Sequence, residues 1–113
     1  MLVFKIFRQS EWNDFATVGT TRGAAIDLSD GYIHLSTSTQ VAETAEKHFG
    51  GAEDLILLAF DPDALGAALR WEKSRGGQDF PHLYRSLSID EVIWTSPLPL
   101  DDVGRHIFPA KAK

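Results

Sequence analysis

Cysteine is absent from the chain of 113 residues, and long apolar runs are absent as well. The missing thiols exclude a disulfide framework, a cysteine nucleophile and a thiolate metal site. No apolar run approaches the roughly 18 residues of a membrane-spanning helix, and no basic segment leading into a long apolar stretch marks a secretory signal. We therefore expect a cytoplasmic protein without membrane attachment.

Positive charge is also scarce. Eleven lysine and arginine residues stand against 16 aspartate and glutamate residues, which gives a net charge of −5 at pH 7. Broad binding to a nucleic-acid backbone needs a positive field, so this balance argues against it and leaves only a local basic cluster for one phosphate. The length suits a single domain over residues 1–113, and 24% charged and 43% hydrophobic residues are ordinary for a soluble globular protein.

The familiar nucleotide and metal motifs are missing too. No Gly-x-Gly-x-x-Gly follows a predicted strand and no P-loop is present, which argues against a Rossmann or Walker site. The histidines are widely spaced, and no His-x-x-x-His pair places two ligands on one helix face. We therefore predict no metal site. The four histidines are His34, His48, His82 and His106.

Hydrophobic patterns predict an α+β fold with about two helices and roughly five to seven short strands. The continuous apolar run over residues 55–60 is the best candidate for a central strand buried on both faces. Helices are expected over 11–18, with Ser10 as the N-cap, and over 39–49, ended by Gly50-Gly51. The other expected strands cover residues 2–7, 32–36, 70–72 and 91–95. Loops are expected over 19–25 and 74–79, and an edge segment with a loose basic tail over 101–113.

The most informative stretch is residues 30–40, where a histidine-bearing strand leads into a hydroxyl-rich helix start. Asp30-Gly31 predicts a turn, and in the strand that follows, Tyr32 and His34 share one face. Free N–H groups at the start of the next helix can hold an anion, and an ordinary N-cap explains the hydroxyl residues equally well.

A second group is Pro81-His82-Leu83-Tyr84. Proline disfavours helix at the preceding residue, and an extended backbone points His82 and Tyr84 to the same side. Such a pair forms either part of a site or the edge of an ordinary strand. If His82 meets His34 from another strand, the two histidines define one site.

Charged residues make up the remaining candidates. Arg70 and Arg75, beside Gly76-Gly77, suit a phosphate, although exposed Arg–Glu pairs on a loop are the commoner explanation. Glu72 follows Arg70 on the same predicted strand. Glu91 begins the last predicted strand, where a carboxylate either stabilises a developing cation or only keeps the surface soluble.

Two motifs carry a family resemblance. Asp30-Gly31-Tyr32-Ile33-His34-Leu35-Ser36 and Phe80-Pro81-His82-Leu83-Tyr84, with Trp71-Glu72 and Ser74-Arg75-Gly76-Gly77 between them, resemble a family of small bacterial proteins known as domain of unknown function 952. The resemblance covers nearly the whole chain. One departure is Arg85, where the family pattern has glycine after the motif tyrosine.

The resemblance implies a fold similar to that of the ADP-ribosyltransferases and RNA 2′-phosphotransferases, in which a split, strongly bent antiparallel β-structure holds NAD between its halves. By position, His34 would hydrogen-bond the ribose, His82 and Tyr84 would line the nicotinamide side, and the arginines would bind the pyrophosphate. The implied catalytic residues are His34, Glu72 and Glu91. The implied ligand-binding residues are His34, Ser36, Thr37, Arg70, Arg75, His82 and Tyr84.

Three functions are consistent with these sequence features. The first is an NAD- or ADP-ribose-type pocket that carries out ADP-ribosyl transfer or a related phosphotransfer, with NAD as substrate and no resident cofactor. The second is the same pocket as a non-catalytic nucleotide or metabolite binding module, and the third is a small structural or interaction protein. The first two differ in whether Glu72 or Glu91 faces the pocket, and the third predicts that His34 and His82 lie far apart. The sequence leaves the oligomeric state open.

Overall fold

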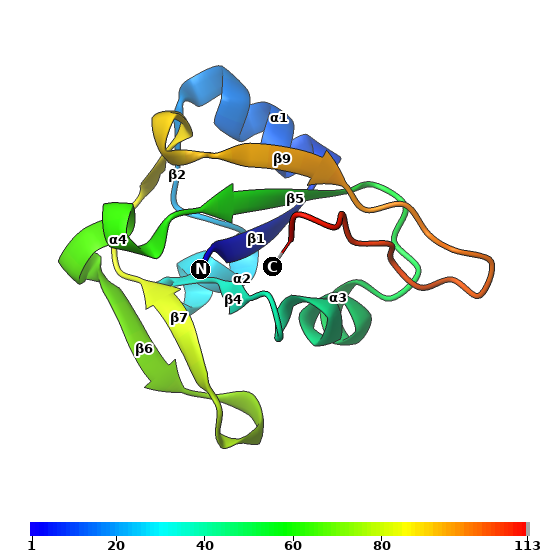
Figure 1. Cartoon of the computed structure of the whole chain (residues 1–113). Helices are drawn as coiled ribbons and strands as arrows, with labels where there is room; N and C mark the ends of the chain where they lie inside the picture. The colour runs from blue at the N-terminus through cyan, green and yellow to red at the C-terminus, as the bar shows by residue number, and fades with distance from the viewer. Residues whose placement is uncertain (113) are drawn as a thin grey trace.

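A four-stranded antiparallel sheet lies at the centre of the computed structural model, which describes residues 1–112 apart from the side chain of Arg75. Its strand order is β4-β1-β5-β9 (Figure 1). The four strands are β1 (Val3–Arg8), β4 (Ser36–Thr37), β5 (Leu55–Phe60) and β9 (Trp94–Pro97). β1 and β5 are the two inner strands, which confirms the predicted central strand over residues 55–60.

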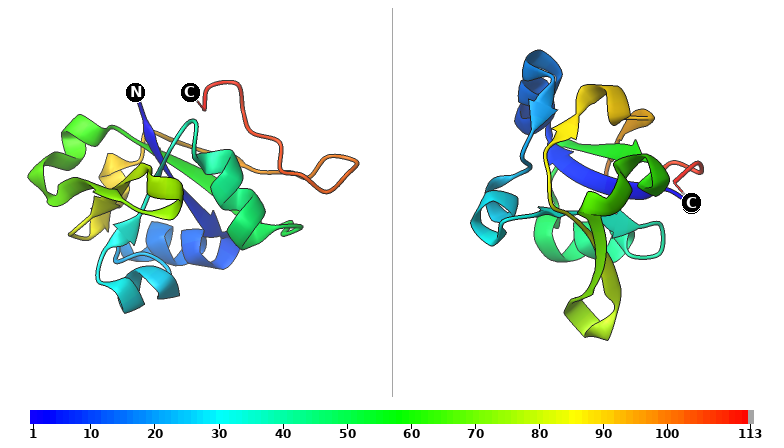
Figure 2. Two further views of the ribbon diagram at one scale, coloured as in Figure 1. Left: turned by 90° about the horizontal axis from the view of Figure 1, so that it is seen from below. Right: turned by 90° about the vertical axis from the view of Figure 1, so that its left-hand side faces the viewer.

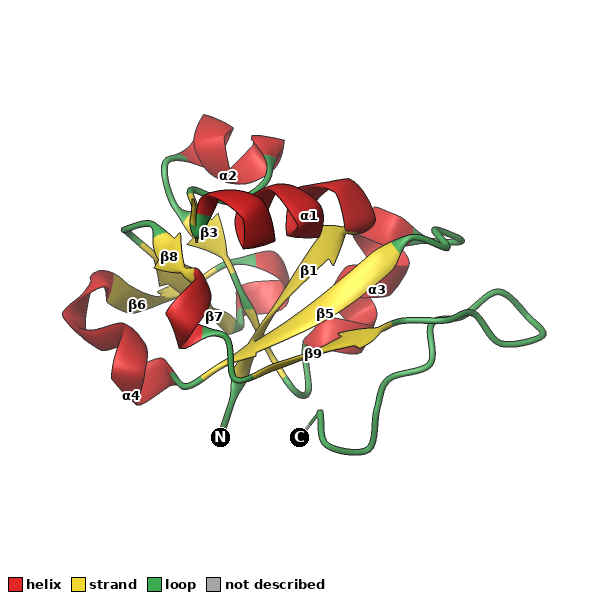
Figure 3. Ribbon diagram, turned by 90° about the horizontal axis from the view of Figure 1, so that it is seen from above, coloured by secondary structure: helices red, strands yellow, loops and turns green. Residues whose placement is uncertain are grey.

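Two hydrophobic clusters cover the two faces of this sheet. Because side chains alternate along a strand, Leu58 and Phe60 of β5 join one cluster, whereas Leu57 and Ala59 join the other. Helix α1 (Gln9–Val18) packs Phe15 into the first cluster, and α3 (Val41–Phe49) packs its apolar side into the second. Figures 1 and 3 show these two helices on opposite sides of the sheet.

Two smaller antiparallel sheets complete the β-structure. One has the order β3-β7-β6 and the other pairs β2 with β8. Their strands are β2 (Thr20–Thr21), β3 (Ile33–His34), β6 (Leu69–Lys73), β7 (Asp79–Leu83) and β8 (Leu87–Ser88). The hairpin of β6 and β7 extends away from the central sheet (Figures 1 and 2).

The helices correct several sequence predictions. Besides α1 and α3, the structure has two short helices. The patterns did not predict α2 (Ala25–Asp30), whereas α4 (Pro62–Leu65) overlaps residues 64–69, where either one helical turn or a loop is expected. Three 3₁₀ turns also occur: η1 (Gly66–Ala68), η2 (Arg75–Gly77) and η3 (Ile89–Glu91). Ser10 lies inside α1 and is not its cap. The cap is Arg8, whose backbone N–H donates to Glu11 Oε1 at 2.7 Å. Among the described residues, none of the helices is long and apolar enough to cross a bilayer.

Three other boundaries also differ from prediction. The strand expected over residues 32–36 breaks at Leu35 into β3 and β4, which belong to different sheets. The strand expected over 91–95 begins only at Trp94. The segment after β9 is not a loose tail, because His106 Nε2 lies 2.8 Å from the carbonyl oxygen of Ala52 and Phe108 packs against the second cluster.

Candidate functional site

One face of the β3-β7-β6 sheet gathers most of the predicted site residues. Ile33 and Leu83 pair across β3 and β7 and point into the core, so their neighbours point to the other face. His34 pairs with His82 in this register, and Arg70 pairs with His82 from the other side. Glu72 comes two residues after Arg70, and Tyr84 comes two residues after His82, so both share that face. We call it the ring face.

Four rings pack together on the ring face, and Tyr32 is at their centre. The Tyr32 ring centroid lies 4.6 Å from that of His34, 4.2 Å from His82 and 5.2 Å from Tyr84. The two imidazole centroids are 5.5 Å apart. His82 is only 4% exposed, because Tyr32 covers it. The two histidines therefore share one site, contrary to what the structural-protein hypothesis predicted.

Glu72 is the carboxylate of the ring face. Its Oε1 atom accepts a hydrogen bond from the Tyr84 hydroxyl at 2.6 Å and lies 2.9 Å from His82 Nδ1. The hydrogen bond from Tyr84, followed by that from His82, lowers the pKa of Glu72, and the same contact raises the pKa of Tyr84. Glu72 is therefore ionised at neutral pH while its carboxylate stays accessible to a ligand.

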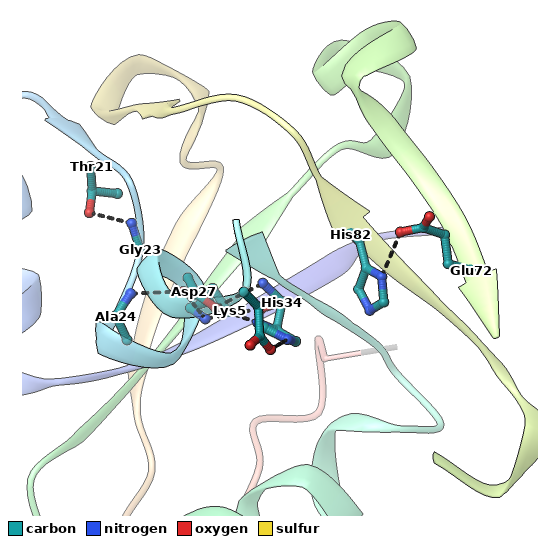
Figure 4. Close-up of polar contacts among 9 residues, drawn as sticks. Lys5, Thr21, Gly23, Ala24, Asp27, His34, Glu72 and His82 are labelled. Carbon is teal, nitrogen blue, oxygen red and sulfur yellow. Dashed lines mark hydrogen bonds and ion pairs between the residues drawn. The ribbon is translucent and has the colours of Figure 1, made fainter. Parts of the chain in front are cut away.

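A second carboxylate, that of Asp27, is buried behind the ring face, and the sequence did not reveal it. Figure 4 shows the contacts that hold its side chain. It accepts hydrogen bonds from the N–H of Ala24 at 2.7 Å and that of His34 at 3.0 Å, and it lies 2.6 Å from His34 Nδ1 and 2.7 Å from Lys5 Nζ. Burial opposes its ionisation, but the bonds from His34 and Lys5 outweigh burial and lower the pKa of Asp27.

This arrangement orients His34. An ionised Asp27 at Nδ1 places a hydrogen on that nitrogen and directs Nε2 outward. There Nε2 lies 3.0 Å from Asp30 Oδ2, at the end of α2. The Lys5 ammonium also donates to the His34 carbonyl at 3.1 Å, so one buried ion pair fixes both the ring and the backbone of this histidine.

One sequence signal does point to Asp27. Lys5 is flanked on both sides by apolar residues of strand β1 and is only 6% exposed, and a buried ammonium requires a partner. The partner sits on α2, a helix of six residues that is too short to show a hydrophobic period. Tyr32 was likewise not predicted as a site residue, although it touches the other three rings.

Gly23 allows the close packing around Asp27, which gives a first prediction. Its φ is +97°, and a Cβ at this position would overlap the Asp27 carboxylate. Gly51 has a similar φ of +76° with no heavy atom within 4 Å of such a Cβ. Both alanine variants carry backbone strain, so we expect Gly23→Ala to lose about 1–3 kcal/mol more unfolding free energy than Gly51→Ala in urea titrations. Equal losses would show that the contact with Asp27 is unimportant.

Three of the other predicted site residues, Ser36, Thr37 and Glu91, have their side-chain contacts away from the four rings. Ser36 is buried and its hydroxyl lies 3.1 Å from that of Thr44, and the Thr37 hydroxyl lies 3.2 Å from that of Thr39. Glu91 belongs to η3 and not to a strand, and its carboxylate binds the Arg85 guanidinium. The Arg75 side chain lies outside the described residues. Arg70 is on the ring face, with its guanidinium carbon 4.9 Å above the Tyr84 ring centroid.

A shallow depression of about 100 Å³ adjoins the four rings. Tyr32 and Tyr84 form part of its wall, and Arg22, Arg85 and Ser86 complete the rim. Elsewhere in the part of the chain that the structure describes, three or more histidine, aspartate or glutamate side chains do not gather in a way that would hold a metal ion. The chemistry available is therefore that of stacking rings, imidazoles, two accessible carboxylates (Glu72 and Asp30) and arginines.

Comparisons with known proteins place the chain in a family. The family described as "Protein of unknown function (DUF952)" matches residues 6–95. A crystal structure of protein CC0527 from Caulobacter crescentus is 46% identical, with a TM-score of 0.91 over 95% of this chain and 94% of that one. A solution NMR structure of CC0527 gives 47% identity and a TM-score of 0.84 over 92% and 90% of the two chains. No curated protein matches. The chain therefore belongs to the DUF952 family.

Proposed function

We propose that the ring face binds an NAD- or ADP-ribose-type nucleotide and that Glu72 promotes cleavage of the bond between ribose and nicotinamide. The observation that carries the proposal is the position of Glu72. Tyr84 and His82 hold this ionised carboxylate on the same face as the four rings. A ligand that stacks on the rings would bring its ribose beside a fixed negative charge.

The rings suit the planar parts of such a ligand. Tyrosine and histidine rings stack with nicotinamide or adenine, and each stacked base contributes about 1–3 kcal/mol in comparable aromatic sites. His34 is held from behind by Asp27, and its outward Nε2 lies 3.0 Å from Asp30 Oδ2, so a ribose hydroxyl that binds this nitrogen takes the place of the Asp30 carboxylate. Tyr32, at the centre of the four rings, and Tyr84 are both partly exposed, so a ring of the ligand can stack on them.

The carboxylate suits the chemistry of the glycosidic bond. The bond that breaks joins C1′ of the ribose to the nicotinamide nitrogen, and both electrons leave with nicotinamide, which departs as a neutral molecule. Positive charge develops on the ribose, and a nearby ionised carboxylate stabilises it. Water then adds to C1′ and releases a proton to solvent. Among the two carboxylates considered from the sequence, Glu72 is on the ring face, whereas Glu91 is held by Arg85.

The relation between the sheets supports the same proposal. The chain leaves the three-stranded sheet at His34 and enters the four-stranded sheet at Ser36, so the two sheets separate around Leu35. A β-structure divided in this way is what the resemblance to ADP-ribosyltransferases implies. In our proposal the ligand lies on the outer face of the smaller sheet, next to this division.

Calorimetric titration of the protein with NAD, ADP-ribose and nicotinamide tests the proposal. We expect saturable binding of NAD or ADP-ribose on the order of micromolar, weakened about 10- to 100-fold in His34→Ala by the loss of one hydrogen bond and one stacking ring. His48→Ala removes an exposed histidine on α3 and should bind like the wild type. Thermal unfolding confirms that each variant is folded at the assay temperature. If the wild type binds none of the three compounds, the proposal is refuted.

A further inference from the structure

The depression beside Tyr32 has no role in the site described so far. It lies between the loop before α2, which carries Arg22, and the turn after β7, which carries Arg85 and Ser86. Tyr32 and Tyr84 line it and also belong to the four rings, so the depression is continuous with the ring face. At about 100 Å³ it holds only part of a nucleotide, since whole ligand pockets measure about 300–1,000 Å³.

The depression carries a net positive charge when the charged groups that form ion pairs are left out of the sum. Asp27 contributes to its lining, but the Lys5 ammonium balances that carboxylate at an N···O distance of 2.7 Å. The charge of the Arg85 guanidinium is balanced by the Glu91 carboxylate, with N···O distances of 2.6 and 3.0 Å. Arg22 is exposed, and in the described part of the chain no carboxylate lies within ion-pair distance of it. Arg22 is therefore the uncompensated charge at this rim.

Donors in the depression also favour an anion. The Arg85 guanidinium is fixed by Glu91 and by the carbonyl oxygens of Leu65 and Ser86, all through its two terminal nitrogens, so its Nε–H is left over. The Ser86 hydroxyl makes no hydrogen bond among the described contacts and is exposed at the rim. Guanidinium and hydroxyl donors around a small hollow match the oxygens of a phosphate.

We infer that this depression is the phosphate subsite of the ligand, with Arg22 as its principal charge and Ser86 and the Arg85 Nε–H as supporting donors. The inference rests on the proposed function and narrows it, because it makes phosphorylated nucleotides the ligand class and excludes free nucleosides as good ligands. It also replaces the sequence-based choice of Arg70, whose guanidinium packs over the Tyr84 ring on the ring face.

Two ligands, the wild type and three variants separate the outcomes. ADP-ribose carries phosphates, and nicotinamide riboside carries none, so calorimetry with both isolates the phosphate contribution. Arg22→Gln should weaken ADP-ribose binding about 10- to 100-fold, the range of a charged hydrogen bond, and change nicotinamide riboside binding by less than about 2-fold. Arg22→Lys should recover part of the loss. Arg105→Gln removes an exposed arginine from a different hollow and should bind both ligands like the wild type.

The same experiment identifies which idea fails. If the wild type binds ADP-ribose and Arg22→Gln binds it equally well, the phosphate subsite is wrong and the proposed function stands. An equal loss of both ligands in Arg22→Gln would also overturn the subsite, because the effect would not depend on phosphate. If the wild type binds neither of these ligands and does not bind NAD, both proposals are wrong. Arg22 is exposed, so loss of folding does not complicate the comparison.

Discussion

Asp27→Asn is expected to lower the free energy of unfolding by about 3–5 kcal/mol, because it leaves the Lys5 ammonium buried without a counter-ion. Lys5 and Asp27 are 6% and 1% exposed and lie 2.7 Å apart. Urea unfolding of the variant and the wild type measures the difference. The matched control is Lys5→Met combined with Asp27→Asn, which removes both charges, keeps one acceptor oxygen for the N–H groups of Ala24 and His34, and should cost less than Asp27→Asn alone. A double variant that is less stable than the single one would contradict the ion-pair explanation.

The dependence of the unfolding free energy on pH, measured at acid pH, tests the role of Asp27 independently. Its pKa is lowered in the folded protein, so the ionised form favours folding above the unfolded-state pKa of about 3.9. This contribution is lost as the pH falls through the lower folded-state value. Wild type should therefore lose stability below about pH 4 more steeply than Asp27→Asn. Glu72 and Glu91, whose pKa values are also lowered, contribute equally to both proteins and cancel in the comparison.

Glu72→Gln is expected to slow nicotinamide release from NAD by about 100- to 1,000-fold, the typical loss when one group that stabilises transition-state charge is removed. Binding of ADP-ribose should change far less, since the product carries no developing charge at C1′. Release is measured by chromatography under saturating NAD. Glu53→Gln, an exposed carboxylate outside the ring face, should keep the wild-type rate.

The outcomes of that assay also decide between the two binding hypotheses. If the wild type binds NAD but releases no nicotinamide, the protein is a non-catalytic binding module. If Glu91→Gln loses activity and Glu72→Gln keeps it, we have chosen the wrong carboxylate. We chose Glu72 because the contacts of Glu91 serve to shape η3. The Glu91 carboxylate accepts a hydrogen bond from the backbone N–H of Ser88 at 2.9 Å and two from the Arg85 guanidinium.

Sequence patterns predicted the parts of the site that lie on strands or directly next to them. Alternation placed His82 and Tyr84 on one side, and Tyr32 and His34 on one side, and the structure confirms both pairs through their ring contacts and through Glu72. The apolar run over 55–60 predicted the central strand correctly because an inner strand is buried on both faces.

The remaining errors come from tertiary contacts that no local pattern encodes. Glu91 was assigned to a strand because apolar residues follow it, but the Ser88 and Arg85 contacts turn the chain into η3. Asp27 was overlooked because its partners, Lys5 and His34, come from two other elements. Tyr32 was not assigned to the site because the register of β3 against β7 brings it over His82.

The most direct measurement is a titration of ¹⁵N-labelled protein with ADP-ribose, followed by two-dimensional NMR of the backbone amides. We predict saturable shifts concentrated at residues 32–34 and 82–84, with a second group around Arg22 and Ser86. The hollow between α3 and the C-terminal segment, lined by Glu46 and Phe108, should remain unchanged and serves as an internal control. Shifts confined to that hollow, or no saturable shifts at all, would contradict the assignment of the ring face as the ligand site.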